Sequence, residues 1–211
     1  MRSHDTHFDA VLLDLGGVLI EVDPARAMRY WEQAAALAPG SLDPGCLDHD
    51  DHARFERGEI DESQWFTALA GRLGLALPQD RMVEGWNAIL GERFADAALV
   101  VARAREFGPV FLFSNTNVTH ARAWSARFAP LRSRFDGVFL SHEIGQRKPD
   151  PSAFAAVAAR MERGAGADPV LRRLGGQRAG RPAGGHASGP SGPAPTCSPA
   201  WRAGRFVPEA P

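Results

Sequence analysis

The sequence predicts an α/β fold, a doubly wound parallel sheet with a helical cap inserted after its first strand and an incomplete C-terminal end. Three observations lead to this prediction. Short apolar runs of strand length alternate with helical patterns, which is typical of parallel sheets. A block of about 70 residues behind the first strand shows only helical patterns. In the last 49 residues Gly, Pro and Arg replace the apolar residues that a core requires.

The first predicted strand covers residues 8–13, where Val11, Leu12 and Leu13 form an unbroken apolar run. Such a run is typical of a strand that is buried on both faces of a parallel sheet. The polar and glycine-rich residues 14–17 follow at once. We therefore expect a sharp loop at the carboxyl end of this strand.

The cap block, residues 22–92, is predicted to be entirely helical. Asp23 followed by Pro24 is typical of a helix start, with Asp as the N-cap and Pro in the first turn. Asp61 with Gln64 three residues later predicts a second capped helix, which Gly74 ends. The apolar spacing places three tryptophans in the core of the cap: Trp31, Trp65 and Trp86.

Strand and helix alternate again behind the cap. Apolar runs at 110–113 and 138–140 predict two further buried strands. The helical patterns between and around them cover residues 95–106, a segment with Ala121 and Trp124, and residues 150–161. We therefore predict a Rossmann-like core made of residues 1–21 and 93–162.

Residues 163–211 form a tail of different composition. It carries seven Arg against two acids, a charge of +5, whereas the first 162 residues carry −6. It also holds 10 Gly and 8 Pro, so we expect it to be disordered.

Composition also excludes some classes of protein and suggests a compartment. The formal net charge is −1, so no basic excess indicates nucleic-acid binding. No apolar stretch of about 18 residues predicts a membrane span, and no signal peptide is expected. Two cysteines, Cys46 and Cys197, imply no disulfide framework. A cytoplasmic protein is therefore expected, and its oligomeric state stays open.

Polar residues follow each of the three predicted strands. Ligands of open parallel sheets collect at the carboxyl ends of the strands, so Asp14, Ser114 and Lys148 are expected around one crevice. Gly16 and Gly17 allow backbone N–H groups to turn toward an anion. A carboxylate nucleophile, a hydroxyl donor and an ammonium group together suit phosphoryl transfer. Phosphate and carboxylate repel each other, so a divalent cation is expected as well.

Four segments resemble one known family. Residues 8–19 (FDAVLLDLGGVL), 111–117 (FLFSNTN) and 145–151 (GQRKPDP) are similar to the first three motifs of the haloacid dehalogenase (HAD) superfamily. Residues 55–60 (FERGEI) resemble the cap of its sugar-phosphate phosphatases, notably the glucose-1-phosphate phosphatase-like branch. The resemblance implies a hydrolase that acts on small phosphate monoesters, such as sugar phosphates, through an aspartyl-phosphate intermediate.

The resemblance also implies roles for individual residues. Asp14 would be the nucleophile, and Ser114 and Lys148 would complete the catalytic set. Mg²⁺ would be held partly by Asp14 and by the carbonyl of Gly16. The implied partner is a small phosphorylated metabolite. The substrate-binding residues would be Gly16, Gly17 and Asn115.

The chain departs from the family pattern in two places. Gly16 stands where many members carry a second Asp, which leaves the protonation of the leaving group unassigned. The family also places a fourth strand with paired acids after the Lys148 helix, whereas residues 164–181 hold one acid, Asp168. Our hypothesis is a shifted reading frame or an unrelated replacement end, with impaired activity.

Two other functions stay open. The same Asp14 could hydrolyse a carbon–halogen bond without metal, which Gly16 permits. Alternatively, the chain is a catalytically inactive remnant or a binding protein. Two features are weighed as structural rather than functional: the run of acids and histidines at 48–52 as a solvated loop or helix start, and His120 as a satisfied supporting group.

Overall fold

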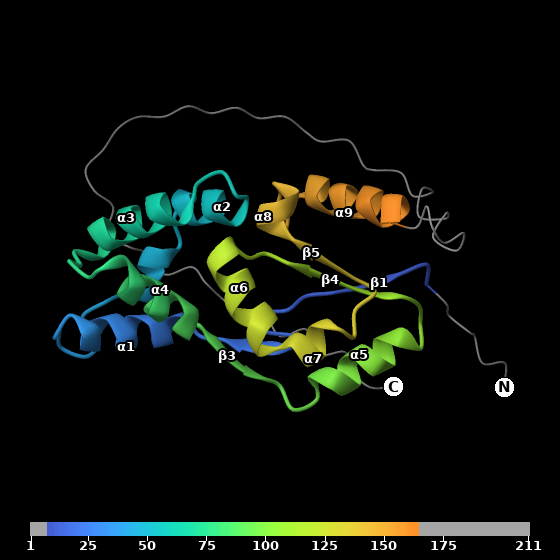
Figure 1. Ribbon diagram of the computed structural model, residues 1–211, viewed down its shortest axis with the longest axis horizontal. Coiled ribbons are helices and arrows are strands. Elements are labelled where there is room, and N and C mark those ends of the chain that lie inside the picture. Colours follow the sequence, from blue (N-terminus) through green and yellow to red (C-terminus); the bar gives the residue numbers. More distant parts are fainter. Residues whose placement is uncertain (1–7, 165–211) are drawn as a thin grey trace.

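The computed structural model describes residues 8–164 (Figure 1). The elements in chain order are β1 Val11–Leu13, β2 Ile20–Val22, α1 Pro24–Ala34, the 3₁₀ helix η1 Pro44–Leu47, α2 Asp50–Glu56, α3 Glu62–Leu73, α4 Gln79–Ala88, β3 Leu90–Arg93, α5 Ala97–Arg105, β4 Val110–Ser114, α6 Val118–Arg127, α7 Ala129–Arg132, β5 Gly137–Leu140, α8 Ser141–Ile144 and α9 Pro151–Gly164. Most of the tail predicted to be disordered and the stretch in place of the fourth motif lie outside the described residues.

The core sheet is parallel, with β4 between β1 and β5. β4 is buried along its whole length, and its side chains alternate between two apolar layers. Phe111 and Phe113 pack against α9, whereas Val110 and Leu112 pack with residues of α5, α6 and α7. Helices therefore cover both faces of the sheet, as Figure 1 shows. This arrangement confirms the predicted doubly wound, Rossmann-like core.

The cap is inserted between β2 and β3 and holds α1, η1, α2, α3 and α4 (Figure 1). Its core contains the three predicted tryptophans; Trp31 and Trp65 are 0% exposed and Trp86 is 1% exposed. Phe55 stacks on Trp65 with ring centroids 5.6 Å apart. The cap therefore has an apolar core of its own.

The prediction that residues 22–92 are entirely helical was wrong at both ends. β2 and β3 pair antiparallel, with Val22 opposite Leu90, and form a two-stranded connection between cap and core. Strands this short show no clear alternation of apolar and polar side chains, and the paired residues of β2 and β3 are about 70 positions apart in the sequence. Local patterns therefore could not reveal the pairing.

The predicted helix boundaries in the cap rest on observed hydrogen bonds. Asp23 Oδ1 accepts from the N–H of Ala25, 3.0 Å away. Asp61 and Gln64 form a complete capping box at the start of α3, with contacts of 2.8 and 2.9 Å. Gly74 ends the same helix in the left-handed conformation, with φ +66°.

Replacing Asp61 with alanine is expected to lower the free energy of unfolding by about 1 kcal/mol, because the amide of Gln64 loses its acceptor. Urea unfolding followed by circular dichroism measures this loss. Asp96→Ala is the matched control, since Asp96 is the N-cap of α5 but its side chain makes no capping hydrogen bond. Equal losses in the two variants would contradict the capping argument.

Candidate active site

The loop after β1 is a tight turn that presents Asp14 at the end of the strand. The Leu15 carbonyl accepts from the backbone N–H groups of Leu19 and Ile20, at 2.8 and 3.1 Å. Gly17 has φ +73°, a conformation that favours glycine. Its N–H donates to the Ile20 carbonyl at 2.9 Å, so this amide is used within the loop. Asp14 Oδ1 accepts from the amide of Leu15 at 2.8 Å.

Asp14 and Lys148 form an ion pair between the first and third motifs. Lys148 Nζ lies 2.7 Å from Asp14 Oδ2 and donates to the carbonyl of Phe113 at 2.8 Å. The ammonium group thus bridges the carboxyl ends of β1 and β4. The Asp14 side chain is 43% exposed, so one side of the carboxylate remains open to a ligand.

Asn115 holds the backbone of Lys148 in place. Its Oδ1 accepts from the Lys148 N–H at 2.8 Å, and its Nδ2 donates to the Lys148 carbonyl at 2.9 Å. Both polar groups of the amide are therefore engaged by one residue. The predicted contact of Asn115 with substrate stays a prediction, while the structure gives this side chain a positioning role for Lys148.

Ser114 ends β4 and is 4% exposed. Its hydroxyl has a long contact of 3.4 Å with the carbonyl of Asn115. The adjacent Thr116 is fixed more firmly, because Ser141 Oγ both accepts from its N–H at 2.9 Å and donates to its carbonyl at 2.8 Å. The ends of β4 and β5 are thus joined, and within residues 8–164 the Ser114 hydroxyl has no short hydrogen bond.

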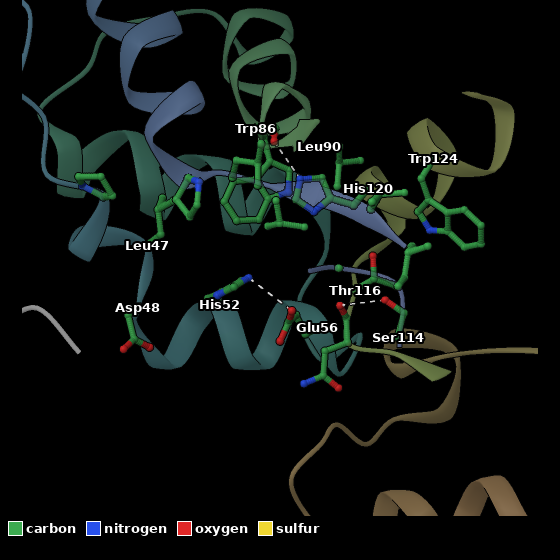
Figure 2. Close-up of a pocket in the computed structure, with 18 of the residues that line it drawn as sticks. Leu47, Asp48, His52, Glu56, Trp86, Leu90, Ser114, Thr116, His120 and Trp124 are labelled. Atoms are coloured by element: carbon green, nitrogen blue, oxygen red, sulfur yellow. Dashed lines mark hydrogen bonds and ion pairs between the residues drawn. The ribbon is translucent and has the colours of Figure 1, made fainter. Parts of the chain in front are cut away.

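These strand ends open into a cavity of about 600 Å³ between core and cap (Figure 2). Asp14, Gly16, Ser114 and Asn115 line it from the core side. The cap contributes a mixed apolar and polar wall, which includes the following residues: Leu47, Asp48, His52, Glu56, Trp86 and Ile89. Gly17 is not among the lining residues, and Lys148 reaches the cavity through its contact with Asp14.

Two charged residues that line the cavity, Glu56 and Arg147, carry no role predicted from the sequence. Glu56 Oε2 lies 2.8 Å from Arg147 Nε, which links cap and core. Burial raises the pKa of the Glu56 carboxyl, while the positive charges of Arg147 and Lys148 offset part of that rise. Both residues lie inside motif segments that the sequence identified, but a contact between distant segments leaves no local signal.

Two histidines of the site lie among tryptophan rings. His52 packs between Trp65 and Trp86, with ring centroids 5.5 and 5.4 Å apart, and burial lowers the pKa of its imidazole to about 4. His120 stacks on Trp86 at 4.7 Å, and burial lowers its pKa to about 4 as well. Both rings are therefore neutral near pH 7, which agrees with a supporting role for His120.

The run of acids and histidines at 48–52 forms a helix start rather than a metal cluster. His49 is the N-cap of α2, and Asp50 and Asp51 lie in its first turn. Within residues 8–164, no group of three or more His, Cys, Asp or Glu side chains could hold a metal ion. Likewise, no helix of the described part is long and apolar enough to cross a bilayer.

The oxygen-bearing residues at the Asp14 loop nevertheless suit Mg²⁺. Mg²⁺ prefers oxygen ligands and is commonly bound through one or two carboxylates, with water and substrate phosphate completing its shell. Asp14 and Gly16, the two residues expected to hold this ion, both line the cavity, and each carries an oxygen of the kind that Mg²⁺ binds. The described residues therefore fit a magnesium ion that depends on the substrate for further ligands.

The structure thus combines a parallel sheet, a carboxylate and a lysine at the carboxyl edge of that sheet, and a cavity that a helical cap helps to line. The chain belongs to the haloacid dehalogenase-like hydrolases, because the model of that family matches residues 8–170. The resemblance seen in the sequence is thereby confirmed.

The individual relatives are distant in sequence, and their names agree with this family. The chain is 24% identical over 155 residues to a D-ribitol-5-phosphate phosphatase of Bacteroides thetaiotaomicron, covering 68% of this chain and 72% of that protein. A HAD family enzyme of the same organism, solved with magnesium and inorganic phosphate, is 26% identical with a TM-score of 0.58, covering 72% and 77%. A HAD-like hydrolase of Porphyromonas gingivalis is 27% identical with a TM-score of 0.59, covering 72% and 76%.

Proposed function

We propose that the protein is a phosphatase of small phosphate monoesters, such as sugar or polyol phosphates, and that it works through an aspartyl-phosphate intermediate. The observation that carries this proposal is the pair of Asp14 and Lys148 at the mouth of a cavity covered by a cap. The likeness to a D-ribitol-5-phosphate phosphatase supports the substrate class. The reducing cytoplasm is the proposed location, based on the cysteine usage.

The proposed reaction uses three side chains at the strand ends. The Asp14 carboxylate attacks phosphorus and forms an acyl phosphate, while the bond to the leaving oxygen breaks. Ser114 donates a hydrogen bond to a phosphoryl oxygen, and Lys148 offsets the negative charge that develops. Water then hydrolyses the aspartyl phosphate and releases inorganic phosphate. The cap excludes bulk water and admits a leaving group that fits the cavity.

Mg²⁺ would be held by Asp14 and the Gly16 carbonyl. Its positive charge would offset the repulsion between the Asp14 carboxylate and the phosphate of the substrate. Within the described residues, no group of three or more His, Cys, Asp or Glu side chains is placed to hold this ion. We therefore propose that activity is metal-dependent and that turnover stays below about 1 s⁻¹, under the ordinary range of enzymes.

Phosphate release from a panel of esters tests the proposed function. The panel contains D-ribitol 5-phosphate, D-glucose 1-phosphate and p-nitrophenyl phosphate, with MgCl₂ or with excess EDTA. We expect phosphate release that needs Mg²⁺ and returns when MgCl₂ is added back after EDTA. In parallel, 2-chloropropionate is assayed for halide release. Halide without phosphate would support the dehalogenase alternative, and neither product would support an inactive remnant.

A further inference from the structure

One step of the proposed reaction, the protonation of the leaving oxygen, has no residue assigned to it. The oxygen that leaves phosphorus in a sugar or polyol phosphate becomes a strongly basic alkoxide unless it is protonated. Gly16 stands where a second carboxylate would serve this purpose. The cavity therefore has to provide an acid from another place in the fold.

In-line displacement restricts where this acid can be. The attacking and leaving oxygens lie on opposite sides of phosphorus. Asp14 approaches from the strand ends of the core, so the leaving oxygen faces the cap. A proton donor for that oxygen is thus expected among the titratable side chains that the cap contributes to the cavity wall.

Other titratable side chains of the cavity, from the cap and from α6 of the core, already make hydrogen bonds or lie exposed. Asp43 caps η1 through the amide of Gly45 at 2.8 Å. His120 Nε2 contacts the Trp86 carbonyl at 2.9 Å and its Nδ1 contacts Asn117 at 3.4 Å, so both ring nitrogens are in use. Asp48 lies exposed at the end of η1.

Glu56 differs from these groups in burial and in its contacts. It is the last residue of α2, its side chain is 9% exposed, and it lines the same cavity as Asp14. Figure 2 shows it on the same cap helix as His52, whose Nε2 lies 3.6 Å from Glu56 Oε1. Oε2 and Arg147 Nε are 2.8 Å apart, yet among the described residues neither of these two buried atoms has a hydrogen bond of good geometry. The carboxyl group thus retains capacity to bind a ligand.

The charges around Glu56 allow it to carry a proton. Arg147 and Lys148 of the core and Arg57 of the cap favour its ionised form, whereas Asp14 favours the protonated form. Burial is the largest influence, and it raises the pKa of Glu56 above the ordinary value of a glutamic acid. His52 is neutral beside it and adds no opposing charge near pH 7.

We propose that Glu56 is the general acid and base of the proposed phosphatase reaction, an inference that rests on that function. As Asp14 forms its bond to phosphorus and the bond to the leaving oxygen breaks, that oxygen takes the proton of the Glu56 carboxyl. The Glu56 carboxylate then takes a proton from the water that attacks the aspartyl phosphate. Release of phosphate leaves Asp14 ionised and Glu56 protonated again, so protons and bonds balance over one turnover.

The leaving group provides a sharp test with the variant Glu56→Gln. D-ribitol 5-phosphate needs a proton on its leaving alkoxide, whereas p-nitrophenyl phosphate releases a stable anion. We expect kcat/KM for the ribitol ester to fall by about 10²-fold, the usual contribution of a general acid. For the nitrophenyl ester we expect a change below about threefold, since that ester needs no acid. Glu59→Gln is the matched control, because Glu59 is an exposed acid of the same segment, and both rates should be unchanged.

Equal losses of kcat/KM on both esters would overturn the proposal, since Glu56 would then act through structure. The absence of a loss on either ester would overturn it as well. A second measurement uses the unmodified protein, in case the variant does not fold. Across aryl phosphates of increasingly basic leaving groups, kcat/KM should depend only weakly on that basicity, and a steep dependence would overturn the proposal. If the unmodified protein hydrolyses neither ester, the proposed function itself fails, a result distinct from the selective loss expected here.

Discussion

The Asp14→Asn variant is expected to lower kcat/KM for every phosphate ester by at least about 10³-fold, because an amide oxygen cannot serve as the nucleophile. The substitution preserves shape, and the Asp14 side chain is 43% exposed, so the fold should tolerate it. Lys148 loses its charged partner but retains the carbonyl of Phe113. Phosphate release and thermal unfolding, measured side by side, separate lost chemistry from lost structure.

Asp9→Asn provides the matched control for this result. It makes the same chemical change at an exposed residue just before β1, away from the carboxyl end of the strand. Its phosphatase activity should stay within about twofold of the unmodified protein, as for a surface change remote from the site. An Asp14→Asn protein that keeps more than a tenth of the activity would show that another group attacks phosphorus.

Local signals predicted the elements of the fold because each of those signals is a short-range interaction. Asp61 and Gln64 satisfy each other's backbone amides within one turn, so three residues of spacing are enough to find the helix start. Apolar runs of four and three residues, at 110–113 and 138–140, were enough to find β4 and β5, since strands covered on both faces need no polar alternation. Family motifs then placed Asp14 and Lys148 at one site.

Contacts between distant segments explain what the sequence did not show. The pairing of Val22 with Leu90 forms only where the chain comes back to β2 after the cap, and no local periodicity in the sequence indicates this. The approach of Glu56 to Arg147 joins a cap helix to a core loop and depends on how cap and core dock. Gly17 was expected to present its amide to an anion, but the loop turns that amide toward the Ile20 carbonyl.

Packing inside the cap leads to the second large expected effect, at Gly85 of α4. A Cβ atom at this position would lie 2.0 Å from Nε1 of Trp31 and 2.5 Å from two other atoms of the ring. Trp31 is completely buried, and its Nε1 also lies 3.3 Å from the carbonyls of Arg81 and Met82. To make room, the buried indole would have to move away from both of these carbonyls.

Gly85→Ala should accordingly lower the free energy of unfolding by about 3 kcal/mol, the upper end of typical overpacking, even though alanine favours a helix by about 1 kcal/mol. Gly71→Ala is the matched control, because Gly71 lies in helix α3 and a Cβ there would meet nothing within 4 Å. That control should gain about 0.5–1 kcal/mol. Urea unfolding followed by tryptophan fluorescence measures both changes. Equal stability of the two variants would mean that α1 and α4 are not packed as closely as Trp31 and Gly85 require.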